Sequence, residues 1–301
     1  GAVQTASMVG QALMLVIAGY VVQVGGGDNG AAVRAMGWTL ILLLPITTLM
    51  AVLLVRETRH PPQPHLGFRA TIKTIVDNKA CRRVLLPDLL LGVAQGVSGG
   101  LFLWFFQFVL GFEREAQTLL AIYFIAGLAG VPIWWVAARK LGKHRALQAA
   151  MIYTALTTGL LFVLPPGAFH IAAPFMVAAG LAQGGGVLLT RSLMADVVDE
   201  DELATGARRS GLYFGLLMTT SKLGVAAGPF TYAVLGLAGF DAAAGADNSP
   251  QALGTLSALF IMGPIILCAL TALSLHKYPL DEARQAQLAA AIAARQNAKP
   301  S

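Results

Sequence analysis

A single ammonium group lies inside a long apolar stretch of this chain. Lys222 is the one charged residue within positions 211–237, a stretch long enough to cross a bilayer as a helix. A helix rises about 1.5 Å per residue, so Lys222 lies roughly 16 Å from Gly211, near the membrane midplane. A charge at that depth is costly unless it faces a cavity or a counter-ion. The position of Lys222 therefore indicates a solute pathway more than a lipid anchor.

The most charged run of the chain comes directly before this stretch. Its members are Asp196, Asp199, Glu200, Asp201, Glu202, Arg208 and Arg209. Asp196 and Asp199 are three residues apart, so they share a face on a helix that extends from the preceding span. Gly206 precedes the arginines, where the chain can turn back into the next helix. Two interpretations stay open: a solvated loop whose ion pairs contribute little to stability, or an ionic latch that opens and closes one end of the pathway.

The composition predicts an all-α polytopic membrane protein. Of the 301 residues, 56% are hydrophobic and only 12% are charged, whereas soluble domains carry about 25% charged residues. Stretches such as 41–44 and 259–270 are apolar on all sides, which does not fit the alternation of a transmembrane β-strand. The net charge of +6 lies mainly in short links, so it is a topogenic signal and nucleic acid is not an expected partner.

Glycine, proline and charge clusters divide the chain into eight expected transmembrane helices. They run over 3–24, 36–55, 84–110, 117–138, 147–164, 170–194, 211–237 and 252–275. The basic links 56–83 and 139–146 are expected on the cytoplasmic side, which places both ends of the chain in the cytoplasm. Residues 68–83 predict an amphipathic interfacial helix. The polar, alanine-rich segment from His276 onward predicts a solvated surface helix.

The sequence contains none of the common catalytic motifs. The chain has no G-x-x-x-x-G-K-[ST] motif, no H-E-x-x-H motif and no paired C-x-x-C motif. Its histidines are scattered, and Cys81 and Cys268 are too few for a disulfide framework. The sequence therefore predicts neither an enzyme nor a site for a metal or cofactor.

The run from Met194 to Lys222 resembles the glycoside–pentoside–hexuronide:cation symporters, a family with the major facilitator arrangement. The pattern of that family has two aspartates three apart, an arginine after a short interval and a lysine in its eleventh helix. In this sequence those positions are Asp196, Asp199, Arg208 and Lys222. Weaker similarities are the aromatic segment F-L-W-F-F-Q-F-V-L-G at 102–111 and the basic segment R-K-L-G-K-H-R at 139–145.

The resemblance implies twelve helices in two six-helix halves, of which this chain carries helices five to twelve. Residues 1–55 would be the last two helices of the N-terminal bundle and 56–83 the cytoplasmic linker between bundles. Residues 84–275 would form the C-terminal six-helix bundle, and 276–301 a cytoplasmic tail. We therefore expect a fragment or a truncated gene product. The cation-site aspartates of the family lie in the first four helices, so the site of the coupling ion, Na⁺ or H⁺, is expected largely outside this chain.

The function that the resemblance implies is secondary active transport in the bacterial inner membrane. A sugar or glycoside would be carried together with Na⁺ or H⁺ by alternating access, in a monomeric carrier embedded in lipid. Lys222 would serve the coupling site, and Asp196, Asp199 and Arg208 the cytoplasmic gate. Further candidates for the substrate cavity are Gln95, Trp104, Gln107, Gln183 and Thr219. Two alternatives stay open: a major facilitator carrier of lipid-like or peptide-like solutes, and a truncated membrane remnant that does not transport.

Overall fold

The computed structural model describes residues 2–24, 29–54, 76–113, 115–206, 209–243, 245–276, 278–280, 284–285, 287–288 and 290–291. Within these ranges the chain is helical and has no strand. The helices are α1 (Ala2–Val24), α2 (Asn29–Leu54), α4 (Lys79–Trp104), α5 (Ala116–Leu141), α6 (Lys143–Gly159), α7 (Phe169–Thr205), α8 (Ser210–Val225), α9 (Gly228–Leu237), α10 (Pro250–Ser257) and α11 (Gly263–Ser274). Short π-helical turns, η1 (Phe105–Val109) and η3 (Ala258–Met262), continue α4 and join α10 to α11, and a 3₁₀ turn, η2 (Leu160–Val163), follows α6.

The helices are long and apolar, which confirms the prediction of an all-α polytopic membrane protein. Six helices in the described part are long and apolar enough to cross a membrane. The helix α1 and the consecutive helices α8 and α9 occupy the other two predicted spans. Apolar side chains along α2 are exposed to the surroundings, as expected for a surface that meets lipid or other apolar partners.

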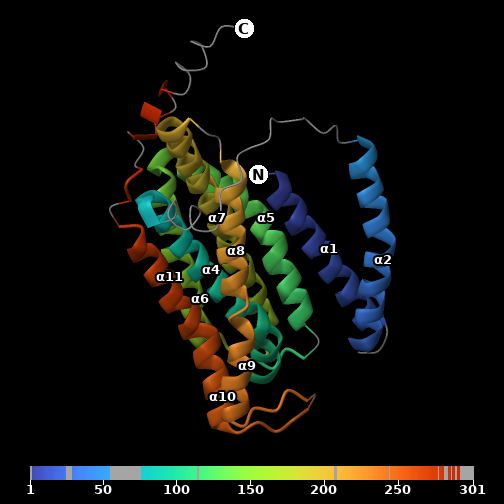
Figure 1. The fold of residues 1–301 in the computed structure, drawn as a ribbon. Coiled ribbons are helices and arrows are strands. Elements are labelled where there is room, and N and C mark those ends of the chain that lie inside the picture. The colour runs from blue at the N-terminus through green and yellow to red at the C-terminus, as the bar shows by residue number, and fades with distance from the viewer. Residues whose placement is uncertain are drawn as a thin grey trace.

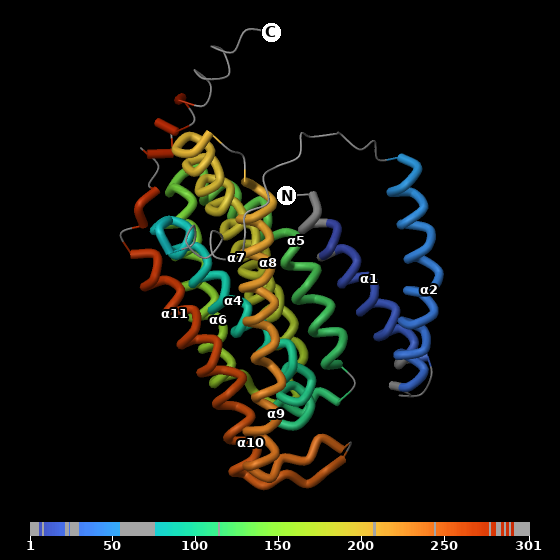
Figure 2. Tube along the Cα trace, viewed as in Figure 1, coloured from blue at the N-terminus to red at the C-terminus, as the bar shows by residue number. Residues whose placement is uncertain are grey.

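The helices α4 to α11 form one bundle, and α1 and α2 lie along one side of it (Figure 1). Within the bundle α5 packs along α7, α4 along α8, and α11 between α4 and α6. The helix α1 packs against α5 and α2, and α2 lies at the outer edge (Figure 2). The ends of α7 and α11 and the starts of α4 and α8 lie together, at the end of the bundle that the sequence predicts to be cytoplasmic (Figure 1).

Two apolar cores fill the bundle, one toward each end. The core at the predicted cytoplasmic end is built around Cys81, Leu147, Leu193 and Tyr213, from α4, α6, α7 and α8. The core at the opposite end is aromatic, and in it the ring of Phe105 in η1 stacks on that of Phe260 in η3 at 4.5 Å between centroids. The two π-helical turns are therefore packed on each other.

The predicted spans differ from the helices in three places. The span 211–237 is interrupted after Val225, because the sequence A-A-G-P places a proline at the start of a new helix. The span 170–194 continues as α7 to Thr205, and Gly206, at φ 76°, ends it in the left-handed conformation. The start of α4 is Lys79, because the side chain of Asn78 caps the helix by accepting a hydrogen bond from the Cys81 amide at 2.8 Å.

The segments on either side of the bundle correct two further expectations. Lys79 to Arg83, expected in the linker and in an interfacial helix, belong to α4, and residues 68–75 of that expected helix lie outside the described residues. The segment after α11 is not simply solvated, because Tyr278, Leu280 and Leu288 are buried in the core at the predicted cytoplasmic end. The polar, alanine-rich composition of this segment did not indicate that these three side chains are buried.

Candidate functional site

The helices α4 and α8 are in direct backbone contact. Gly92 and Gly96 of α4 face Gly224 of α8 and Gly228 of α9. A Cβ atom added to Gly92 would lie 2.6 Å from the carbonyl oxygen of Ser221, and one added to Gly228 would lie 2.7 Å from that of Gly96. Because only glycine leaves room for this approach, the two helices form one closely packed pair.

A carboxylate inside α4 bonds across this pair. The hydroxyl of Thr220 in α8 donates to Oδ2 of Asp88 in α4 at 2.7 Å. The positive charge of Arg191 in α7 acts on the same carboxylate. Asp88 therefore ties together the helix that follows the predicted linker and the helix that carries Lys222.

Lys222 projects from another side of α8, two residues after Thr220. Its side chain is exposed and lines an open surface depression of about 400 Å³ together with Met218, Thr219 and Leu223. Among the described residues no carboxylate lies within ion-pair distance of its ammonium group. The ammonium thus faces out of the described bundle, with mainly apolar side chains around it.

The other predicted cavity residues divide into two groups. Gln95 of α4 is exposed, and so is Thr219, whose hydroxyl donates to the carbonyl of Gly215 at 2.9 Å. Gln183 of α7 instead accepts a hydrogen bond from the hydroxyl of Tyr123 in α5 at 2.7 Å.

The aromatic candidate is also engaged within the protein. The Trp104 ring packs on Tyr232 and Phe240, with centroids 5.1 and 5.4 Å apart. Gln107 is half-buried in the π-helical turn η1. The structure therefore brings Thr219 to Lys222, whereas Trp104 and Gln183 contribute to packing between helices.

The predicted gate contains an ion pair between two helices. Asp196 lies in α7, with Asp199 one turn further along the same helix, as their spacing predicted. Oδ1 of Asp196 lies 2.5 Å from Nζ of Lys143 at the start of α6. Asp196 is buried, so this pair is shielded from water more than a surface pair would be.

A second ion pair closes the turn between α7 and α8. Arg209 precedes α8, and its Nε donates to Oδ2 of Asp201 at 2.8 Å while its Nη2 donates to Oδ1. This two-pronged geometry is the strongest that a guanidinium and a carboxylate can make. The hydrogen bond to Asp201 raises the pKa of Arg209, so the arginine stays charged. Arg208, the arginine predicted for the gate, lies outside the described residues.

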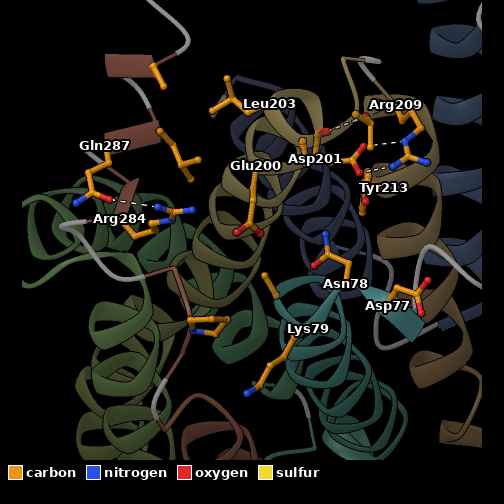
Figure 3. A pocket seen from close by; sticks show the side chains of 16 residues that line it. Asp77, Asn78, Lys79, Glu200, Asp201, Leu203, Arg209, Tyr213, Arg284 and Gln287 are labelled. Carbon is orange, nitrogen blue, oxygen red and sulfur yellow. Dashed lines mark hydrogen bonds and ion pairs between the residues drawn. The ribbon is translucent and has the colours of Figure 1, made fainter.

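A cavity of about 1020 Å³ lies beside this second pair (Figure 3). Asn78 and Lys79 from the start of α4 and Glu200 from α7 line it, and the segment after α11 contributes Arg284 and Gln287. The side chains of Asp201 and Arg209 lie on one side of it, and those of Arg284 and Gln287 on the other (Figure 3). Among the described residues no group of three or more histidine, cysteine, aspartate or glutamate side chains is arranged to hold a metal ion.

The sequence predicted Asp196 and Asp199 as gate residues, but it did not predict which basic residues bind the aspartates of α7. Lys143 was recognised only as part of a basic link, and no spacing rule connects it to Asp196, which is 53 residues away. Arg209 was visible beside Arg208, but its pairing with Asp201, eight residues earlier, was not predicted. Of the residues that were missed, Asp88 alone could have been found from the sequence, because it is a carboxylate within an apolar span.

Comparison with known proteins adds a family to this geometry. A model of the family described as MFS/sugar transport protein matches residues 1–282. The sodium-dependent lysophosphatidylcholine symporter 1 of Homo sapiens is 27% identical over 257 residues, which cover 82% of this chain and 47% of that protein. The inner membrane symporter YicJ of Escherichia coli is 25% identical over 265 residues, covering 84% of this chain and 55% of that protein.

A relative from Synechocystis covers similar shares of the two chains. The uncharacterized symporter sll1374 of Synechocystis is 25% identical over 261 residues, which cover 80% of this chain and 46% of that protein. The chain thus spans about half the length of the curated relatives it matches.

Proposed function

The chain belongs to the MFS/sugar transport protein family of membrane transporters, and we propose that it forms part of a cation-coupled symporter that works by alternating access. The observation that carries this proposal is the exposed ammonium of Lys222 beside an open depression on α8, which together with α9 occupies a predicted transmembrane span. A charge at membrane depth is a functional feature by default, because packing alone gives it no compensation. The chain is not proposed to catalyse a reaction.

The surroundings of Lys222 favour an amphiphilic cargo with an anionic group. Met218 and Leu223 offer apolar contacts beside one ammonium, whereas a sugar needs several hydrogen-bonding partners around its ring. Gln183 and Trp104, two of the five candidates for the substrate cavity, are engaged with other side chains. Several relatives are named as lysophosphatidylcholine symporters, which agrees with such a cargo.

A sugar or glycoside is the second candidate cargo. The family description names sugar transport, and the exposed side chains of Gln95 and Thr219 keep hydrogen-bonding capacity near the helix pair α4–α8. The coupling ion is Na⁺ or H⁺, with its site expected largely in helices that precede this chain. The proposed location is the bacterial inner membrane, as the family resemblance implies, and the basic links support an orientation with both ends of this chain in the cytoplasm.

The ionic groups at the predicted cytoplasmic end act as the gate in this proposal. Asp196 and Asp199 would exchange partners as the two bundles rock against each other, and Arg208 would take part in this exchange. The pair of Lys143 with Asp196 is then one state of the gate, held within the same bundle.

The test is uptake by the full-length protein in proteoliposomes. Labelled lysophosphatidylcholine and a panel of glycosides are offered under an inward Na⁺ gradient, an inward H⁺ gradient, or neither. We expect accumulation of one cargo class under one gradient, and loss of that accumulation in Lys222→Leu. Uptake that is insensitive to both gradients would contradict symport, and no uptake of any cargo would favour a non-transporting remnant.

A further inference from the structure

The segment after α11 is fastened to the bundle at several points. A guanidinium nitrogen of Arg83 in α4 donates to the carbonyl of His276. Beyond that bond, Tyr278 is 5% exposed, Leu280 1% and Leu288 7%, and all three belong to the core at the predicted cytoplasmic end. We call residues 278–291 the strap, because their described members cross the ends of α4, α6 and α7.

The tyrosine of the strap packs on the residue that follows the gate lysine in α6. The ring of Tyr278 packs on that of His144, with centroids 5.9 Å apart and planes 31° apart. His144 follows Lys143 directly in α6, and Lys143 is the residue that binds Asp196. Adjacent residues of one helix therefore contact the strap and the gate aspartate.

Two buried polar atoms in this region, one a hydrogen-bond acceptor and the other a donor, lack partners among the described residues. In the described part of the chain, neither Oδ2 of Asp196 nor the hydroxyl of Tyr278 has a hydrogen-bond partner. One is a carboxylate oxygen that accepts, and the other is a hydroxyl that donates. Leaving either group unpaired in a buried place costs its desolvation free energy.

The electrostatics of the strap agree with a donor hydroxyl. Burial, together with the negative charges of Asp196 and Glu200, raises the pKa of Tyr278, so its hydroxyl keeps its proton at neutral pH. Because the charge of Asp196 contributes to this rise in pKa, that charge acts on the Tyr278 hydroxyl. Oδ1 of Asp196 is already bonded to Lys143, which leaves Oδ2 as its free acceptor.

We propose that the hydroxyl of Tyr278 donates through one buried water to Oδ2 of Asp196, and so positions the gate aspartate against Lys143. Tyr278 is then a positioning residue, and the strap reports the state of the gate: when Asp196 leaves Lys143, Tyr278 loses its acceptor and the strap loosens. This role rests on the proposed function of Asp196 in a gate, whereas the hydrogen bond itself does not.

The native Cys81 thiol measures strap opening without any need for transport. Cys81 is fully buried in the same core as Tyr278, so a maleimide reaches it only when that region opens. The full-length protein is used, with Cys268→Ala and any cysteines outside this chain replaced. Labelling rates are compared for wild type, Tyr278→Phe, Asp196→Ala and the double variant, with Tyr153→Phe as the matched control.

The control removes a hydroxyl from the same part of the bundle. Tyr153 packs against the core that contains Cys81, but its hydroxyl donates to the backbone carbonyl of Ala178 at 2.7 Å. We expect Tyr278→Phe to raise the labelling rate about tenfold, the effect of one lost bond to a charged group. Once Asp196 is alanine, Tyr278→Phe should add less than about twofold. The effect of Tyr153→Phe should be unchanged by Asp196→Ala.

Two results would overturn the inference. One is a Tyr278→Phe protein that labels at the wild-type rate, and the other is a Tyr278→Phe effect of equal size with and without Asp196. If Asp196→Ala does not fold, Asp196→Asn replaces it, and the Tyr278→Phe effect should fall to about threefold because a neutral acceptor bonds less strongly. Failure of uptake in the wild type would refute the proposed function alone, since the labelling cycle still tests the hydrogen bond.

Discussion

Replacing Gly224 by alanine should separate α4 from α8 and destabilise the bundle. The added Cβ would lie 2.5 Å from the carbonyl oxygen of Leu89, 2.7 Å from the amide nitrogen of Val93 and 2.8 Å from the carbonyl carbon of Gly92. All three are backbone atoms, so no side chain can rotate away to make room. The added methyl group has to be accommodated by movement of whole helices.

The expected loss of stability follows from how much shorter the contact of the added Cβ atom is than an ordinary contact. Ordinary contacts of a Cβ atom begin at about 3.4 Å, so the 2.5 Å contact requires the two backbones to move apart by about 0.9 Å. Overpacking of this kind costs about 1–3 kcal/mol. The better helix propensity of alanine offsets at most about 1 kcal/mol of that cost. Gly224→Ala should therefore lower the free energy of unfolding, with the larger values reached if the contact of Gly92 with Ser221 is also lost.

A buried glycine with room around it supplies the matched control. A Cβ on Gly186 in α7 would meet only flexible side-chain ends, with Cδ1 of Leu91 at 3.6 Å and Cε of Met151 at 3.7 Å. Gly186→Ala should therefore be neutral, or stabilising by up to about 1 kcal/mol. Both variants are heated in detergent, and unfolding is followed by reaction of a thiol-sensitive fluorophore with the buried thiols of Cys81 and Cys268.

The comparison of the two variants tests whether α4 and α8 meet backbone to backbone. Gly224→Ala should unfold at a lower temperature than the wild type, and Gly186→Ala at the same or a higher one. Equal midpoints for the two variants would refute the view that α4 and α8 meet backbone to backbone. A loss of stability in both would instead point to a general intolerance of alanine in these helices.

Three further changes test the polar groups. Lys222→Leu should abolish coupled uptake while changing the free energy of unfolding by less than about 0.5 kcal/mol, since the ammonium has no ion pair among the described residues; normal accumulation would contradict its role. Arg209→Gln should destabilise by about 3–5 kcal/mol in the same thermal assay, because it strands a buried carboxylate, and adding Asp201→Asn should recover most of the loss; no recovery would mean that the pair does not carry the effect. Gln183→Leu should cost about 1–3 kcal/mol by leaving the Tyr123 hydroxyl unpaired, with recovery on adding Tyr123→Phe; unchanged stability with a raised KM for uptake would assign Gln183 to the cargo instead.

The hydropathy of the sequence predicted the helices well, but it predicted their ends poorly. The apolar runs predicted the membrane class and the approximate course of eight spans, because lipid demands long apolar helices whatever their partners. The interruption after Val225 was missed although Pro229 signals it, since the segment stays apolar throughout. The start of α4 depends on one side-chain cap at Asn78, which hydropathy does not register.

The candidate site was predictable only where its residues are local in sequence. Asp196 and Asp199 were placed on one helix face from their spacing, and α7 carries both. The contact of Asp196 with Lys143 joins two helices, and the burial of Tyr278 depends on how the chain returns to the bundle. Such contacts are set by the tertiary fold, and a single sequence contains no periodicity that reports them. The roles of Asp196, Asp199 and Lys222 in transport stay predictions.

The interruption between α8 and α9 gives the membrane interior a helix end. The last turn of α8 contains Lys222, and α9 begins only at Gly228. The carbonyl groups at a helix C-terminus carry partial negative charge, together equivalent to about half an elementary charge. Because proline at 229 has no amide hydrogen, the carbonyl of Val225 also lacks its usual helical donor. The backbone dipole therefore supplies part of the counter-charge for the ammonium, and in the proposed transporter a cargo anion or a carboxylate would supply only the remainder.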